Sequence, residues 1–337
     1  MWFNTYTFAA FLVVVFGAYW ALPVRVRAFF LLVASYVFYC WKTPIYGVLL
    51  VISTALDFGC GLGLERTDRP AARRAILLCS LVGNLGMLFF FKYFDFLGEN
   101  LAGIGQLLGL DVHWTAYDFL LPAGISFYTF QTLCYTFEVY RRQIKACRNP
   151  VHFALYVAYF PQLVAGPIER ADRLLPQLQA VQTFSLDNLV AGGGRILIGL
   201  LRKMVVADRL AILVDRVFAH VDDYSTVTIW VAMSAFILQV YFDFAGYSDI
   251  AIGSARLFGV RLTENFRRPL MSCSIADFWD RWHLTLTAWL RENVFYPMGG
   301  SRRGTARTVF NIWVLFLLCG LWHGASWNFV LWGASFA

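Results

Sequence analysis

The chain has 337 residues, of which 59% are hydrophobic and only 15% are charged. A soluble domain carries about 25% charged residues, so the composition excludes an ordinary soluble protein, whose surface would lack the polar side chains that cover a core. The apolar residues form solid runs rather than an alternating pattern, which predicts an all-α, polytopic membrane protein and excludes an outer-membrane β-barrel.

The formal net charge of +7 comes from basic residues between the apolar runs, where such residues orient a membrane protein. No motif that reads a nucleic-acid groove accompanies them, so we expect no nucleic-acid partner. The seven cysteines contain no C-x-x-C pair, which indicates neither a disulfide framework nor a metal site. The N-terminus lacks a basic segment before its first apolar run and is expected to be a retained first span.

Apolar runs follow one another along the whole chain. A spanning helix needs about 20 mostly apolar residues. Several runs are shorter or are broken by glycine and proline, which predicts re-entrant or tilted pieces around a cavity, because lipid-facing backbone cannot be left without hydrogen bonds. The predicted spans are 5–22, 28–46, 46–64, 75–91, 119–138, 151–168, 188–201, 227–245 and 309–323, with a last apolar run at 326–337.

Basic residues are distributed asymmetrically over the loops of the first five spans. If the N-terminus lies outside, the outside loops carry two basic residues, Lys42 and Lys92, and the long loop 92–118 is acidic. The inside loops then carry ten, which by the positive-inside rule predicts an N-out chain. The ten are Arg25, Arg27, Arg66, Arg69, Arg73, Arg74, Arg141, Arg142, Lys145 and Arg148.

Two glycine-containing stretches occur in the second half. The first, "AGGGR" at 191–195, is expected to permit close helix packing rather than to hold a phosphate. The second, "YFDFAGYSDIA", places Asp243 and Asp249 on either side of Gly246 and predicts a break in a helix. Such a break either faces a substrate tunnel or forms a buried polar network that fixes helix packing. The residues expected to line the tunnel here are Asp243, Tyr247 and Ser248.

Residues 274–295, "SIADFWDRWHLTLTAWLRENVF", combine an S-x-x-D start with apolar residues at helical spacing. Ser274 is the predicted N-cap. The pattern predicts one amphipathic helix on the cytoplasmic face, suited to the headgroup layer or to a groove of the protein itself. His283 lies on its apolar side.

The stretch 318–333, "LCGLWHGASWNFVLWG", places His323 in an apolar run. Ionisable residues inside a membrane are costly and are therefore candidates for function. Gly320 and Gly324 let another chain or a ligand approach the ring, and Ser326 and Asn328 can fix its tautomer. A neutral imidazole here acts either as a general base or as a hydrogen-bonded structural group inside the bundle.

These blocks, taken in order, resemble the membrane-bound O-acyltransferase (MBOAT) family, and within it the bacterial branch that O-acetylates alginate and related polysaccharides. The resemblance covers nearly the whole chain. The blocks that carry it are "LLVASYVFYCWKTP", "PAGISFYTFQTLCY", "FPQLVAGPIER", "FDFAGYSDIAIG", "ENFRRPL", "SIADFWDRWHLTLTAWLRENVFYPMGGSRRG" and "LCGLWHGASWNFVLWG".

The resemblance implies a single transmembrane domain over 1–337, with re-entrant and cytoplasmic-face amphipathic helices around a central tunnel. It implies an O-acyltransferase of the bacterial inner membrane, multi-pass, that moves an acetyl group from cytoplasmic acetyl-CoA across the bilayer. No cofactor is expected to be bound permanently. An extracytoplasmic acetyl-carrying or acetyl-transferring protein is the implied partner, and an exopolysaccharide such as alginate is the implied final acceptor.

The resemblance also assigns site residues. His323 matches the family's invariant histidine, and His283 matches the histidine of the R-W-H block. Asn265, in "ENF", and Asn328 are expected to lie along the tunnel. The CoA phosphates are expected to meet basic residues on the cytoplasmic side, although positive-inside orientation explains these arginines equally well. They are Arg281, Arg291, Arg302 and Arg303.

Two alternatives to an acyltransferase follow from the same residues. Broken spans and polar residues at the midplane are also features of transporters, although no inverted repeat is visible. A passive membrane scaffold for an extracytoplasmic acetylase is the other alternative. Members of the family continue beyond the block that contains His323, whereas 11 residues after Ser326 span roughly 17 Å of helix, so the last helix is expected to be short or the chain truncated.

Overall fold

The computed structural model describes residues 1–117 and 121–337, which form two compact units. The first unit comprises residues 1–54 and 147–285, and the second comprises 55–146 and 286–337. Helices are the regular elements of both units, and the described ranges contain no β-strand. This confirms the predicted all-α class. Asp118 and the start of the predicted span 119–138 lie outside the described residues.

The first unit contains two long helical elements near its N-terminus, a group of short helices, and a long helical pair. Its α-helices are α1 (Tyr6–Ala21), α2 (Val24–Cys40), α7 (Pro150–Ala158), α8 (Phe160–Leu163), α9 (Ala171–Gln179), α10 (Leu186–Leu200), α11 (Asp208–Ala219), α12 (Thr226–Leu257) and α13 (Ile275–Trp279). A π-helical turn, η1 (Leu201–Ala207), joins α10 to α11, and short 3₁₀ turns occupy η2 (Val221–Asp223) and η3 (Pro269–Met271).

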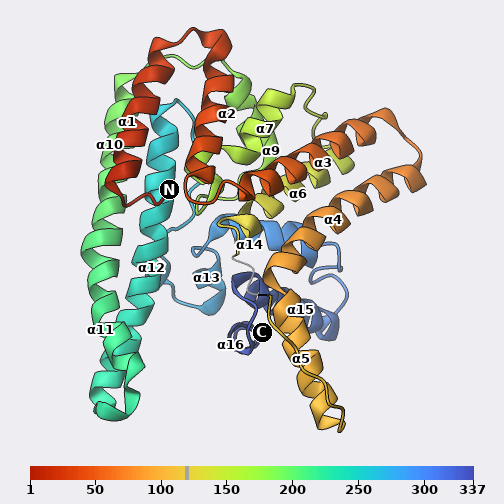
Figure 1. Cartoon of the computed structure of the whole chain (residues 1–337), viewed down its shortest axis with the longest axis vertical. Coiled ribbons are helices and arrows are strands. Elements are labelled where there is room, and N and C mark those ends of the chain that lie inside the picture. The colour runs from red at the N-terminus through yellow and green to blue at the C-terminus, as the bar shows by residue number, and fades with distance from the viewer. Residues whose placement is uncertain (118–120) are drawn as a thin grey trace. The chain divides into compact units, whose positions relative to one another are not determined.

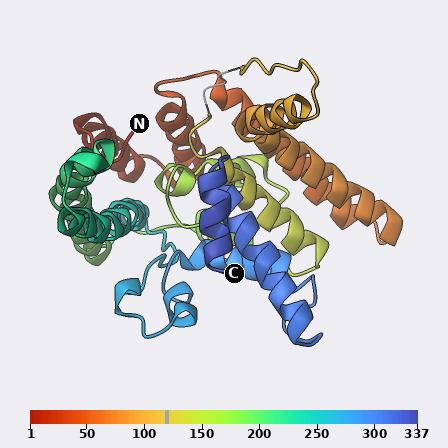
Figure 2. The same ribbon diagram turned by 90° about the horizontal axis from the view of Figure 1, so that it is seen from below.

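The second unit packs α4 against α6 and α15 against α16, as Figure 2 shows for the two helices nearest the C-terminus. Its elements are α4 (Pro70–Lys92), α5 (Phe94–Leu107), α6 (Ile125–Tyr140), the π-helical turn η4 (Arg291–Phe295), α15 (Thr305–His323) and α16 (Trp327–Ser335). Two helices, α3 (Tyr46–Arg66) and α14 (Leu284–Leu290), begin in the first unit and end in the second.

Four helices in the described part of the chain are long and apolar enough to cross a membrane: α3, α4, α12 and α15. They coincide with the predicted spans 46–64, 75–91, 227–245 and 309–323. The first predicted span, 5–22, corresponds to the shorter apolar helix α1. Many of the exposed side chains on α4 and α12 are large and apolar, as a lipid-facing surface requires.

The predicted span at 151–168 is wrong. The chain forms α7, breaks at Tyr159, and continues as the single turn α8. In one continuous helix Pro161 would have to donate to the carbonyl of Val157, but it has no N–H, so it lies instead in the first turn of α8, where none is needed. Tyr156, Tyr159 and Phe160 are fully buried, so this segment belongs to the core of the first unit and does not face lipid.

The predicted helix break at 243–249 is also wrong, because α12 runs without interruption from Thr226 to Leu257. Its glycines serve close packing against the run of α10, η1 and α11, which lies beside it (Figure 1). A Cβ on Gly246 would lie 2.8 Å from the carbonyl oxygen of Gly199. One on Gly253 would lie 2.6 Å from that of Gly192, so the packing role predicted for 191–195 is confirmed at Gly192.

The segment 274–295 is not the single amphipathic helix that its spacing predicts. Ser274 caps α13 by accepting a hydrogen bond from the backbone N–H of Asp277, as predicted, but α13 ends at Trp279. The chain then turns, and His283 adopts a positive φ of 42°, which an α-helix cannot contain. The apolar residues at helical spacing are therefore divided between two short helices, α13 and α14, and do not form the apolar face of a single helix.

Candidate active site

His283 and Asn265 form a buried polar cluster in the first unit. Both side chains are 1% exposed. The Asn265 Oδ1 atom lies 3.1 Å from His283 Nδ1, and it accepts hydrogen bonds from the hydroxyl of Thr285 at 3.0 Å and its backbone N–H at 3.3 Å. An amide oxygen only accepts, so this contact places the His283 ring proton on Nδ1.

The surroundings of this cluster come from α12 and the segment after it. Asn265 Nδ2 donates to the hydroxyl of Ser248 at 3.4 Å. Phe244 meets the His283 ring edge to face, with centroids 4.7 Å apart. The structure thus brings together Asn265, His283 and Ser248, three of the residues predicted from the sequence.

A second row of contacts, which the sequence did not reveal, fixes the position of the Asn265 loop. Glu169 is 1% exposed and accepts hydrogen bonds from the Thr263 hydroxyl at 3.0 Å and from its backbone N–H. The backbone N–H of Ile168 donates to the Thr285 hydroxyl at 3.0 Å. Burial raises the pKa of Glu169, against the hydrogen bonds from Thr263 that favour its ionised form. The signal in the sequence was a carboxylate in the mostly apolar stretch "FPQLVAGPIER".

His323 lies in the second unit, at the last residue of α15. The rings of Trp322 and Trp332 meet it edge to face, with centroid distances of 4.9 Å and 5.1 Å, and Phe329 stacks at 6.4 Å. A Cβ on Gly324 would lie 2.1 Å from the Phe329 ring. The small residue here therefore lets α16 fold back onto α15, so the close approach that the glycines permit is made by the chain itself.

The end of α15 is held by side chains from the end of α4. Lys92 Nζ donates to the carbonyl of Trp322 and, at 3.2 Å, to the hydroxyl of Ser126. The Tyr93 hydroxyl donates to the carbonyl of Leu321 at 2.7 Å. The last carbonyls of a helix lack partners within it and carry partial negative charge, so this cation both satisfies and stabilises the helix end next to His323. From the sequence, Lys92 had only a role in topology.

Asn328 does not form the contact expected of it. It is exposed on α16, and within the described ranges no hydrogen bond joins it to His323.

Asp243 and Tyr247 pack against the π-helical turn. Asp243 forms an ion pair with Lys203, which also pairs with Asp208 at 2.8 Å. The Lys203 ammonium lies 5.3 Å from the centroid of the Tyr247 ring. These contacts correspond to the packing alternative for 243–249. Asp249 shares that role, because it pairs with Arg195 at 2.6 Å and with Arg202.

The four arginines predicted to meet CoA are divided between the two units. Arg281 belongs to the first unit and is paired with Asp277 at 2.6 Å, and its hydrogen bond lowers the pKa of the Asp277 carboxyl. Arg291, in η4, and Arg302 and Arg303, in the turn before α15, belong to the second unit and are exposed. The described residues contain no group of three His, Cys, Asp or Glu side chains that could hold a metal ion.

Comparison with known proteins gives a family match and several relatives. Residues 144–336 match the model of the membrane-bound O-acyltransferase family. The chain is 40% identical to a probable alginate O-acetylase, AlgI, of Azotobacter vinelandii over 326 residues, which is 96% of this chain and 64% of the relative. It is 34% identical to the peptidoglycan O-acetyltransferase of Helicobacter pylori, covering 98% of this chain and 68% of that protein.

A more distant relative is the teichoic acid D-alanyltransferase of Bacillus subtilis, at 27% identity over 79% of this chain and 67% of the relative. The chain spans 62% to 66% of the length of the alginate relatives that it matches. Both histidine clusters fall within the residues that match the family model.

Proposed function

Because this chain belongs to the membrane-bound O-acyltransferase family, we propose that it transfers an acetyl group from acetyl-CoA to a hydroxyl group of alginate or a related polysaccharide. Family membership confirms the resemblance predicted from the ordered motifs. The relatives named for alginate and peptidoglycan O-acetylation support an acetyl group and a polysaccharide acceptor. The chain is proposed to act as one transmembrane domain in the bacterial inner membrane.

His323 is the proposed general base. One nitrogen of its ring takes the proton of the acceptor hydroxyl while the oxygen attacks the thioester carbonyl, forming the C–O bond. The C–S bond then breaks, and the thiolate of CoA takes up a proton to leave as the free thiol. A positioned base contributes about 10²–10⁴-fold to such a step. The observation that carries this proposal is the placement of His323 among aromatic rings at the end of α15, within the segment that matches the family.

The His283–Asn265 cluster is also proposed to take part in the reaction. Its Nδ1 contact with Asn265 orients the ring and fixes its tautomer. Thr285 binds the same amide oxygen and extends this arrangement to the start of α14. We assign His283 a role in the transfer, with Asn265 and Ser248 beside it as tunnel residues; Asn328 is a proposed tunnel residue of the second unit.

The donor and acceptor are proposed to reach the site from opposite sides of the membrane. Ten basic residues against two favour an N-out chain with its arginine-rich loops in the cytoplasm, where acetyl-CoA is available. Arg281, Arg291, Arg302 and Arg303 are proposed contacts for CoA phosphates. The polysaccharide, or an extracytoplasmic protein that carries the acetyl group to it, receives the group on the other side.

The test is acetyl transfer from radiolabelled acetyl-CoA by purified protein in liposomes, with an alginate oligosaccharide as acceptor. His323→Gln is expected to lower the rate at least 10²-fold, because the variant keeps a polar side chain but loses the base. His113→Gln is the matched control, since that histidine is exposed and its ring is hydrogen-bonded to Asp111. It should retain the full rate.

Other outcomes favour the other functions. Wild-type activity in His323→Gln would make that histidine structural and leave a scaffold role. Acetyl-CoA left unconsumed by the wild type, together with movement of a solute across the liposome membrane, would indicate a transporter. The continuous helix α12 removes one observation on which a transporter depended, namely the predicted break at 243–249.

A further inference from the structure

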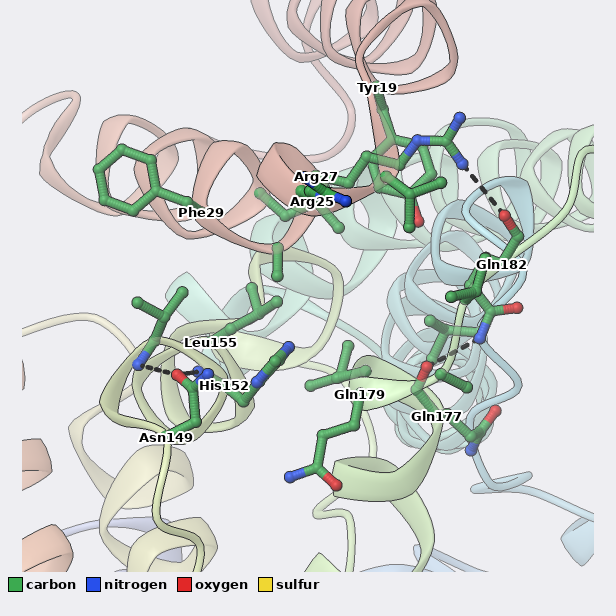
Figure 3. Close-up of a pocket in the computed structure, with 18 residues that line it drawn as sticks. Tyr19, Arg25, Arg27, Phe29, Asn149, His152, Leu155, Gln177, Gln179 and Gln182 are labelled. Carbon is green, nitrogen blue, oxygen red and sulfur yellow. Dashed lines mark hydrogen bonds between the residues drawn. The ribbon is translucent and has the colours of Figure 1, made fainter.

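The first unit contains a cavity of about 310 Å³ that the proposed transfer does not use. It lies between the start of α2, the start of α7 and the chain that leaves α9 (Figure 3). Its polar lining consists of arginine, histidine, asparagine, glutamine and tyrosine side chains, and no carboxylate lines it. A pocket that offers hydrogen-bond donors and positive charge without any acidic residue suits an anion.

The two arginines of the cavity have different roles. Arg27 is fixed, because its guanidinium donates to the carbonyls of Leu22 at 3.0 Å, Gln182 at 3.0 Å and Trp20 at 3.4 Å. Arg25 is exposed, and within the described part of the chain its side chain has no hydrogen bond or ion pair. Arg25 therefore retains its charge and its donors for a ligand.

The opposite side of the cavity is built on the first turn of α7. Asn149 caps this helix by accepting hydrogen bonds from the backbone N–H groups of Val151 and His152. Figure 3 shows the His152 ring across the cavity from Arg25 and Arg27. Burial lowers the pKa of His152, so its ring is neutral at pH 7 and offers one N–H donor.

Large apolar side chains accompany this polar lining. Val24 is 44% exposed, Phe29 58% and Val181 67%, and all three line the cavity. Arg25 and Arg27 lie in the first turn of α2 and belong to the basic residues that the positive-inside bias assigns to the cytoplasmic face. A basic cavity with exposed apolar residues at its lining is expected where a protein surface meets lipid headgroups.

We propose that this cavity binds the phosphate headgroup of an anionic phospholipid of the cytoplasmic leaflet, with Arg25 and His152 as the residues that bind the phosphate. The volume is at the lower end of the range for ligand pockets, so the cavity accommodates a small headgroup rather than a nucleotide. No residue of either histidine cluster lines this cavity. Lipid binding to this cavity can therefore be tested whether or not the chain is an acetyltransferase.

The experiment is native mass spectrometry of delipidated, full-length protein titrated with phosphatidylglycerol or phosphatidylcholine. One phosphatidylglycerol is expected to bind at least tenfold more tightly than phosphatidylcholine. Arg25→Gln should weaken the phosphatidylglycerol complex about tenfold, as the loss of a charge-assisted hydrogen bond implies. Arg74→Gln is the matched control, because Arg74 is also exposed, lies near the start of a helix as Arg25 does, and belongs to the basic residues assigned to the same membrane face. It should change the affinity less than threefold.

A steric variant tests the cavity independently of charge. Ala28 lines it, and Ala28→Phe fills part of the space without removing any donor. This variant should lose the bound phosphatidylglycerol while keeping its melting temperature within a few degrees. Equal binding of phosphatidylglycerol by the wild type, Arg25→Gln and Ala28→Phe would overturn the proposal. Displacement of the lipid by equimolar glycerol phosphate would also overturn it, since the ligand would then be a free phosphate ester rather than a lipid.

Discussion

Asn265 is the residue on which the buried cluster of the first unit depends. Its amide oxygen serves the His283 ring and both donors of Thr285, while its amide nitrogen reaches Ser248. A buried amide with so many partners costs little to bury, but its removal leaves several groups without hydrogen bonds. The side chain therefore fixes the conformation of the loop as well as the orientation of the ring.

Replacing Asn265 with alanine is expected to destabilise the fold by about 2–4 kcal/mol, because the donors of Thr285 and His283 lose their acceptor. The loss should appear as a lower melting temperature in detergent, together with a lower rate of acetyl transfer. Thr285→Ser is the control, since it retains the hydroxyl that binds Asn265 and should change both quantities little. Unchanged stability in Asn265→Ala would show that water replaces the amide.

Glu169 gives a prediction for the pH dependence of stability. Burial raises the pKa of this carboxyl above its ordinary value of 4.5, so the folded protein takes up the proton at a higher pH than the unfolded chain. Lowering the pH then favours the folded state. The melting temperature of the wild type relative to Glu169→Gln should therefore rise as the pH falls from 7 towards 4.5. A difference that stays constant over this range would exclude a raised pKa.

The residues of the candidate site were predictable to different extents. His323 and His283 stand out because an ionisable side chain in an apolar context is costly. Glu169 and Thr285 did not, since their role depends on contacts with residues more than 90 positions away. For Lys92 only its charge in a predicted loop could be recognised from the sequence, because its partner is a backbone carbonyl of α15, which no residue type indicates.

At the scale of elements, the helices α10 and α12 are held together by paired glycines. Gly192 faces Gly253, and Gly199 faces Gly246, each backbone approaching the other so closely that a Cβ would lie within 3 Å of a carbonyl oxygen. Such contacts between small residues are how helices pack where the hydrophobic effect contributes little.

Gly199→Ala should destabilise the protein by about 1–3 kcal/mol, because its new methyl group would lie 2.7 Å from the Gly246 carbonyl oxygen and the helices must separate. Gly193→Ala is the matched control on the same helix, where a Cβ meets nothing within 4 Å. That substitution should be neutral or stabilising by up to about 1 kcal/mol, since alanine favours the helix. Thermal unfolding in detergent measures both, and equal shifts would contradict glycine-mediated packing.

Helix positions were predictable where composition alone determines them, and breaks were not. The runs that became α3, α4, α12 and α15 are long, apolar and nearly free of charge. Gly246 suggested a break, but a glycine in a helix also permits close approach, and only the neighbouring helix distinguishes the two roles. Conversely, residues 280–283 contain no glycine or proline, so their turn could not be predicted from the residue types.

At the scale of the whole molecule, the arrangement of charge is the main guide to orientation. In the second unit, α4 begins near Arg73 and Arg74, and α15 begins near Arg302, Arg303 and Arg307. The C-terminal ends of the two helices meet through Lys92. Both helices thus have arginines at their N-terminal ends and contact each other at their C-terminal ends. This is the arrangement expected of two helices that both begin at the cytoplasmic face.

Cysteine labelling tests the orientation. Cys273 is exposed and directly precedes the segment 274–295, which is expected on the cytoplasmic face. In a variant that retains only this cysteine, it should react with a membrane-impermeant maleimide after cells are permeabilised and not before. A Thr115→Cys substitution in a cysteine-free background places the probe in the loop assigned to the outside and should react in intact cells. The reverse pattern would invert the topology.

The length of α12 couples the protein to the thickness of its membrane. Its 32 residues extend about 48 Å, whereas the hydrocarbon layer is about 30 Å thick. The helix must tilt or extend into the aqueous layer, and the balance between the two depends on the length of the lipid acyl chains. Because Ser248 and Asp249 occupy its later turns, a thicker or thinner bilayer would change how deeply those polar groups are immersed, and enzyme turnover should vary with the lipids in which the protein is reconstituted.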